Sequence, residues 1–188
     1  MELQAPLTLL ALVTLVLGAV VCDLRTRRIP NTLVGVGIAL GFLFQIVALM
    51  GGDHFVNPIG ASSFGSALLG GLIGLGLFLP FYALRTMGAG DVKLLAMVGV
   101  WLGPQHVVWA TLWTMAAGGL LALAVALGTG VLRPVLSNLH TMIVTSLMHA
   151  RTAGSLGVTA PAETTGRLPY AVAIACGTAA EIVRILTH

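Results

Sequence analysis

The sequence predicts an all-α polytopic membrane protein with about six transmembrane helices and one amphipathic helix on the cytosolic face. Of its 188 residues, 57% are hydrophobic and only 8% are charged, and the mean hydropathy is +1.02. Soluble domains contain about 25% charged residues, so this composition excludes an ordinary soluble domain. Several uncharged stretches also reach the roughly 20 residues that a helix needs to cross a bilayer.

The apolar stretches and the residues that interrupt them define the predicted spans. The uncharged stretch from Leu94 to Leu132 is about twice as long as one span. The Gly-Pro-Gln sequence at 103–105 is its natural break, because glycine and proline interrupt helices. We therefore expect transmembrane helices over Ala5–Cys22, Leu33–Met50, Phe64–Leu84, about Val92–Leu102, about Gln105–Gly128 and Leu168–Leu186.

The basic residues orient these helices. With the N-terminus outside, eight of the nine lysines and arginines fall on the inner side, and only Arg184 falls outside. The positive-inside rule therefore predicts an N-out protein of the cytoplasmic (inner) membrane. Membrane topology and contact with anionic lipid also explain the pI of 9.4, so no nucleic-acid partner is needed.

The remaining inner segment, residues 133–167, is expected to belong to the same single domain, 1–188. Residues 133–150 place apolar side chains near helical spacing with polar ones between them, which predicts the amphipathic helix on the cytosolic face. Residues 151–167 are rich in Gly, Thr, Ala and Pro, which is typical of a flexible loop.

The six acidic residues fall into two groups. Four are expected where water is accessible, in the tail, in loops or near the outer end of a helix: Glu2, Asp53, Glu163 and Glu181. Asp23 ends the first predicted helix and Asp91 begins the fourth, so both are expected at the cytosolic edge of the membrane. Desolvating a charge there is costly, and these two acids are therefore the candidate site.

The fourth predicted helix is short. The residues from Gly90 to Leu102 extend about 20 Å at 1.5 Å per residue, whereas the hydrocarbon core is about 30 Å thick. We therefore expect Asp91 to lie below the headgroups yet open to the cytosol through the glycine loop. Gly88 and Gly90 lack Cβ atoms, so an extended peptide is expected to approach this backbone closely.

Two carboxyl groups at one level suit peptide hydrolysis by an aspartic mechanism. One, ionised, takes a proton from the attacking water, and the other, protonated, donates to the carbonyl oxygen. The helix dipoles favour Asp91, at a helix N-terminus, as the ionised acid and Asp23, at a C-terminus, as the protonated one. The cysteines Cys22 and Cys176 form no CxxC motif, and no metal site or other cofactor is predicted.

Simpler interpretations stay open for each residue alone. Asp23 is equally consistent with an ion pair to a nearby arginine, and Asp91 with an ordinary N-cap. Lys93 follows Asp91 by two positions and therefore faces away from it on a helix. It is expected to extend its ammonium group toward the cytosolic headgroups.

The segments DLRTRRIPN (23–31) and GAGDVKLLAMVGVWLG (88–103) together resemble the prepilin peptidases, which are membrane aspartic proteases of the GxGD type. The later segment LPYAVAIACG (168–177) is similar to the last span of that family. The resemblance implies that Asp23 and Asp91 are the catalytic pair. It also implies a group of motif residues that shape or support the site, namely Gly88, Gly90, Lys93, Arg28, Ile29, Pro30 and Asn31.

The resemblance further implies a substrate. It would be a type IV prepilin-like protein whose short basic leader precedes a hydrophobic helix, cut at the cytosolic boundary of the bilayer. The chain has neither the cytosolic insertion nor the paired CxxC motifs of larger members that also N-methylate their product, so it resembles the short form that serves tight-adherence (Flp-type) pili. We hypothesise that Lys93 attracts an acidic residue early in the mature pilin, and that the 151–167 loop gates access.

Three alternatives remain. An archaeal preflagellin peptidase would use the same chemistry. A proton-coupled transporter would carry its acids near mid-membrane in inverted repeats, whereas these acids lie at one edge. A non-catalytic subunit of a pilus assembly machine would tolerate Asp→Asn changes at both positions.

Overall fold

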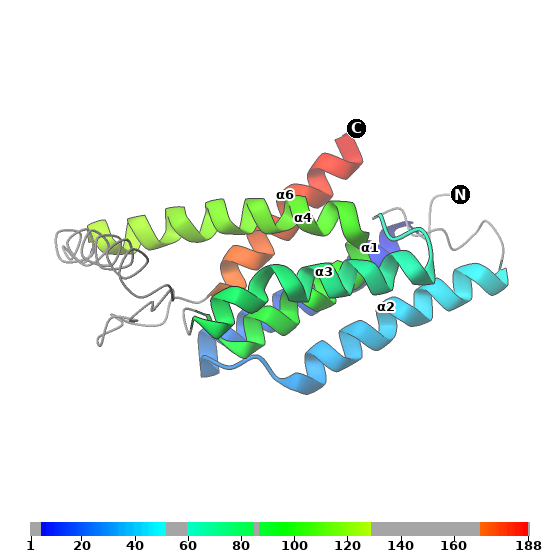
Figure 1. Ribbon diagram of the computed structural model, residues 1–188, viewed down its shortest axis with the longest axis horizontal. Coiled ribbons are helices and arrows are strands. Elements are labelled where there is room, and N and C mark those ends of the chain that lie inside the picture. Colours follow the sequence, from blue (N-terminus) through cyan, green and yellow to red (C-terminus); the bar gives the residue numbers. More distant parts are fainter. Residues whose placement is uncertain (1–4, 52–59, 85–86, 129–169, 188) are drawn as a thin grey trace, which may run out of the picture.

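The described part of the protein is entirely helical in this computed structural model, which covers residues 5–51, 60–84, 87–128 and 170–187 (Figure 1). Its helices are α1 (Ala5–Thr26), α2 (Asn31–Gly51), α3 (Phe64–Ala83), α4 (Ala89–Gly128) and α6 (Tyr170–Thr187). The all-α prediction is therefore confirmed for these residues. The predicted amphipathic helix (133–150) and loop (151–167) lie outside them.

Helix α4 consists of two arms, the first from Ala89 to Gly103 and the second from Pro104 to Gly128. Gly103 has φ 76° and ψ 177°, and Pro104 follows it, so the helix breaks at the predicted Gly-Pro-Gln position. A left-handed φ favours glycine, and proline removes a backbone donor from the next turn. The Ala61 N–H donates to the Trp101 carbonyl at 3.4 Å, next to this break. Figure 1 shows the second arm running back past the first.

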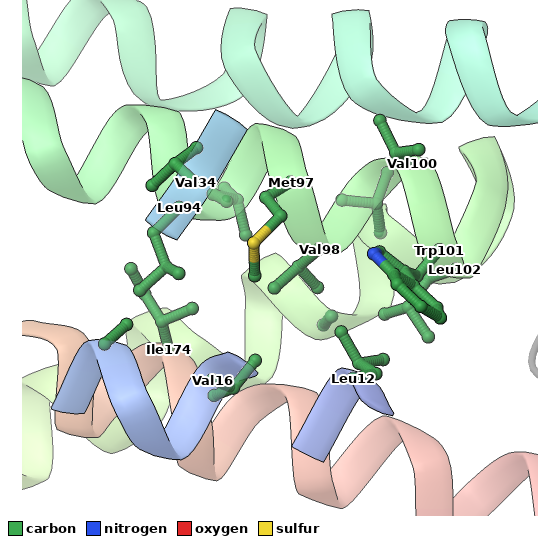
Figure 2. Close-up of a cluster of buried hydrophobic side chains, with 14 of the residues drawn as sticks. Leu12, Val16, Val34, Leu94, Met97, Val98, Val100, Trp101, Leu102 and Ile174 are labelled. Carbon is green, nitrogen blue, oxygen red and sulfur yellow. The ribbon is translucent and has the colours of Figure 1, made fainter. Parts of the chain in front are cut away.

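The first arm of α4 is the core of the bundle. Every residue from Leu94 to Gly103 is buried, as expected for a central helix that other helices surround. Figure 2 shows its side chains meeting Leu12 and Val16 of α1 and Ile174 of α6. The indole Nε1 of Trp101 donates to the Gly37 carbonyl of α2 at 3.0 Å, which satisfies its polar atom inside the apolar core.

Glycines allow α2 and α3 to approach this arm closely. A Cβ on Gly70 of α3 would overlap the Gly99 carbonyl oxygen, and one on Gly74 would lie 2.6 Å from the Leu95 carbonyl oxygen. On α2, a Cβ on Gly41 would lie 2.8 Å from Val100. Small residues four apart are the usual means by which membrane helices pack backbone to backbone. These close contacts with α2 and α3 thus fix the position of the first arm within the bundle.

Four of the described helices are long and apolar enough to cross a membrane, namely α1 (over Leu7–Thr26), α3, α4 and α6. Helix α2 contributes a shorter apolar stretch over Asn31–Val47. The chain is therefore a membrane protein by helix length and composition. Six spans, and the N-out topology, stay predictions.

Candidate active site

The segment 23–31 forms a tight connection between α1 and α2. Helix α1 continues past the predicted end to Thr26, and Arg27 then adopts φ 53° while its N–H donates to the Asp23 carbonyl at 2.9 Å. A left-handed residue after the last turn is the usual way to end a helix. Pro30 directly precedes Asn31, the first residue of α2, where a missing N–H does little harm.

Asp23 lies in the last turn of α1 and is only 8% exposed. Its Oδ2 accepts a long hydrogen bond, 3.4 Å, from the Ala171 N–H in the first turn of α6. The two residues are 148 positions apart in the chain. A nearly buried acid therefore faces the N-terminus of another helix.

Asp91 lies in the first turn of α4 and is half-buried. Its Oδ2 accepts from the Gly88 N–H at 3.2 Å, and its own N–H donates to the Gly88 carbonyl at 3.2 Å. This reciprocal pair resembles half of a capping box, so one oxygen of Asp91 does act as a helix cap. Capping and a chemical role are compatible, because a carboxylate has a second oxygen.

The two motif segments touch each other. A Cβ on Gly90 would lie 3.2 Å from the Ile29 Cβ, so the space over this glycine is filled by Ile29 rather than open to a peptide. The Lys93 Nζ donates to the Asn31 Oδ1 at 3.0 Å, which links α4 to the start of α2. Arg28 is exposed. The segments 23–31 and 88–103 thus contact each other at two points.

The start of α6 completes the site. The residue before Ala171 is Tyr170, whose phenol lies within Coulombic range of Asp91. The Tyr170 ring packs edge-on against Phe78 of α3, with ring centroids 6.0 Å apart. The first turn of α6 therefore contacts Asp23 through Ala171, and Tyr170 precedes this contact by one residue. The sequence reasoning did not single out Tyr170, although it stands in the 168–177 segment that carried the resemblance.

The α6 N-terminus also changes the electrostatic comparison between the acids. The predicted roles rested on Asp91 being at a helix N-terminus and Asp23 at a C-terminus. Because α6 directs the Ala171 N–H at Asp23, both acids face the N-terminus of a helix. The α6 dipole therefore opposes that of α1 at Asp23, and the predicted division of roles between the two acids stays a prediction.

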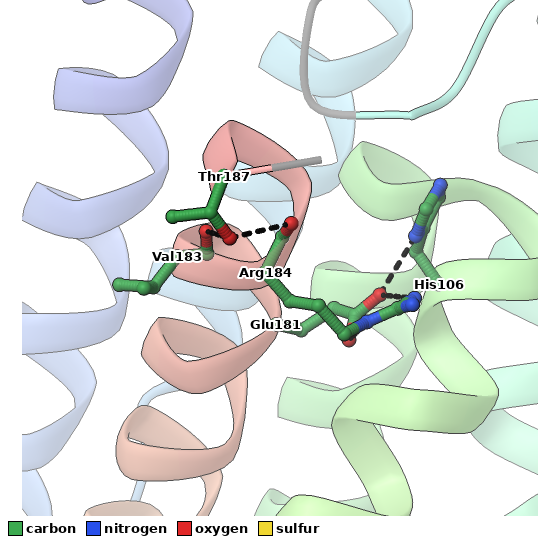
Figure 3. Close-up of polar contacts among 5 residues, drawn as sticks. All are labelled: His106, Glu181, Val183, Arg184 and Thr187. Atoms are coloured by element: carbon green, nitrogen blue, oxygen red, sulfur yellow. Dashed lines mark hydrogen bonds and ion pairs between the residues drawn. The ribbon is translucent and has the colours of Figure 1, made fainter.

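A second acidic group lies near the other end of α6, and here the sequence prediction was wrong. Glu181 was expected to be easily solvated, yet it is fully buried. Its carboxylate accepts from Arg184 Nη2 at 2.6 Å and Nε at 2.8 Å, and its Oε1 lies 2.7 Å from His106 Nδ1 of α4 (Figure 3). The Arg184 guanidinium also lies 5.2 Å from the centroid of the Trp109 ring. Two basic side chains and a hydrogen-bonded fork make the burial of this charge tolerable.

Among the described residues, no group of three or more His, Cys, Asp or Glu side chains could hold a metal ion.

Comparison with known proteins yields one match. Residues 9–123, more than half of the chain, match the model of the type IV leader peptidase family. This range includes both motif segments and ends within the second arm of α4. The comparisons with curated proteins and with solved structures found no match.

Proposed function

The chain belongs to the type IV leader peptidase family, and from this premise we propose that it is a membrane aspartic endopeptidase that cleaves type IV prepilin-like substrates. The observation that carries the proposal is the convergence of three helix ends on two acids. Asp23 accepts from the first turn of α6, and Asp91 lies within Coulombic range of the same turn. The contact of Ile29 with Gly90 supports the same convergence.

The proposed chemistry needs only these two acids and a water molecule. One carboxylate takes a proton from the water molecule as the water oxygen attacks the scissile carbonyl carbon. The other carboxyl group donates its proton to the carbonyl oxygen at the same time. When the C–N bond breaks, the leaving nitrogen takes a proton from the acid that gained one, and one hydroxyl of the tetrahedral intermediate returns its proton to the acid that donated it, which restores both aspartates. The products are the leader with a new C-terminal carboxyl group and the pilin with a free amine. The pair titrates as a unit, so the proposal assigns neither role to one residue.

The proposed substrate has a short basic leader followed by a hydrophobic helix. Asp23 and Asp91 stand at ends of apolar helices, so a substrate helix in the bilayer would present its own boundary to them. We propose that this boundary is the cytosolic one and that the substrates are of the Flp type. We also propose that the product is not N-methylated, since the chain contains two cysteines and no CxxC motif.

The test uses the full chain in lipid nanodiscs and a synthetic Flp-type prepilin. We expect the wild type to release the leader, and Asp23→Asn and Asp91→Asn each to lower the rate by about 10²–10⁴-fold. The third aspartate, Asp53, lies outside the described residues and outside both motifs, so Asp53→Asn is the matched control and should cleave like the wild type. A wild type that does not cleave, or a mutant at either motif aspartate that still does, refutes the proposal.

Mass spectrometry of the product tests the finer points. The mass of the mature fragment identifies the cleaved bond, which is expected directly before the hydrophobic segment. With S-adenosylmethionine present, the mass should stay that of the free amine. A gain of one methyl group would show that the absence of the paired CxxC motifs does not prevent methyl transfer.

A further inference from the structure

Tyr170 is fixed in place by packing on two sides. Its ring meets Phe78 of α3 edge-on at 6.0 Å, and a Cβ on Gly118 of the second arm of α4 would lie 2.9 Å from its hydroxyl oxygen. Edge-to-face packing favours a defined ring orientation. A phenol held between α3 and α4 has few rotamers available and therefore directs its hydroxyl group consistently.

Tyr170 also stands next to the residue that contacts Asp23. Ala171, the following residue, donates its N–H to Asp23 Oδ2 at 3.4 Å. The ring is half-buried, so the hydroxyl is neither freely hydrated nor sealed inside the core. A neutral O–H donor thus belongs to the turn of α6 that contacts Asp23.

We propose that the Tyr170 hydroxyl is a catalytic donor in peptide cleavage, giving a hydrogen bond to the scissile carbonyl oxygen as negative charge develops on it. This inference rests on the proposed peptidase function. A fixed donor aimed at developing charge stabilises the transition state more than the ground state. The hydroxyl keeps its proton throughout, so proton transfer stays with the two aspartates.

The first test compares the two tyrosines of the chain in the same nanodiscs. Tyr170→Phe removes the hydroxyl and keeps the ring, so kcat should fall between about tenfold and 10²-fold while KM changes less than about threefold. Tyr82 is 48% exposed on α3, and Tyr82→Phe should match the wild type. Unchanged kcat in Tyr170→Phe, or a change confined to KM or to the unfolding temperature, would refute the donor role. Absence of cleavage by the wild type would instead refute the proposed function.

Inhibitor binding gives a readout that does not depend on turnover. A hydroxyethylene analogue of the substrate carries an oxygen where the tetrahedral intermediate does, whereas a reduced-amide analogue has none. Tyr170→Phe should weaken binding of the hydroxyethylene analogue about tenfold and leave the reduced-amide analogue unaffected. An equal loss for both analogues would mean that Tyr170 only shapes the site.

Two neighbouring glycines provide a variant that keeps the hydroxyl but displaces it. A Cβ on Gly118 would crowd the Tyr170 hydroxyl, whereas a Cβ on Gly119 would meet nothing within 4 Å. Gly118→Ala should therefore lower kcat several-fold, and Gly119→Ala should leave it unchanged. Equal activity of the two variants would show that the position of the hydroxyl is unimportant.

Discussion

The acids near the two ends of α6 have different hydrogen-bond partners. At its start, Asp23 and Asp91 accept hydrogen bonds from the backbone N–H groups of Ala171 and Gly88. Glu181 lies ten residues after Ala171, about 15 Å along α6. It accepts hydrogen bonds from the guanidinium group of Arg184 and contacts His106.

This difference separates the candidate active site at Asp23 and Asp91 from a structural brace, by which we mean Glu181 with its partners Arg184 and His106. A backbone N–H orients a carboxyl group without supplying a counter-charge, so the group can still exchange protons and meet a substrate. A guanidinium fork neutralises the charge, and together with an imidazole it occupies the carboxylate oxygens. Glu181 thus joins α6 to α4, whereas Asp23 and Asp91 are the proposed catalytic pair.

The largest expected effect is a loss of activity without a loss of stability when Asp23 or Asp91 is replaced. Asp23→Asn and Asp91→Asn should lower leader cleavage by about 10²–10⁴-fold while the unfolding temperature stays close to that of the wild type. The reason is that an amide oxygen still accepts the backbone N–H bonds. Peptidase assays and thermal unfolding in the same nanodiscs measure both quantities. An unfolding temperature that falls in step with activity would mean that these acids, like Glu181, are braces.

The next effect concerns the close packing of α3 against the first arm of α4. Gly70→Ala places a Cβ on the Gly99 carbonyl oxygen of the first arm, so the free energy of unfolding should fall by about 3 kcal/mol or more. Gly76, on the same helix, has nothing within 4 Å of its Cβ position, and Gly76→Ala is expected to be neutral. Reversible unfolding in mild detergent compares the two. Equal stability would show that close approach of α3 to α4 is not required.

A smaller effect is expected at the brace. Glu181→Gln leaves Arg184 without its full charge partner and should lower the free energy of unfolding by about 2–3 kcal/mol. At temperatures where the variant is folded, kcat should stay within about threefold of the wild type, because the acid lies far from the site. If cleavage is lost without a loss of stability, Glu181 belongs to the mechanism and the contrast between the two ends fails.

The smallest effect concerns the Lys93–Asn31 hydrogen bond, which is exposed. Lys93→Met and Asn31→Ala should each lower the free energy of unfolding by about 0.5–1 kcal/mol, and the double mutant should lose less than the sum. The same variants test whether Lys93 also attracts an acidic residue of the pilin. If so, Lys93→Met should raise KM for the normal substrate but not for one that lacks this acid.

The sequence alone determined the helical class, the break in α4 and the family. The first two depend on local chemistry, namely apolar content along the chain and the helix-breaking Gly103–Pro104 pair. The family followed from two motifs in order, and the match over residues 9–123 confirms it. The number of spans and the residues between α4 and α6 stay predictions.

Only the tertiary structure decided how the acids are held. Glu181 looked accessible because it stands near a helix end, but its partner His106 lies 75 positions earlier in the chain. Asp23 looked like a C-terminal acid, but the Ala171 N–H reaches it from 148 positions away. Likewise, Ile29 fills the space over Gly90. Periodicity and capping rules describe neighbours within one helix, whereas the environment of a buried charge is set by whichever helix packs against it.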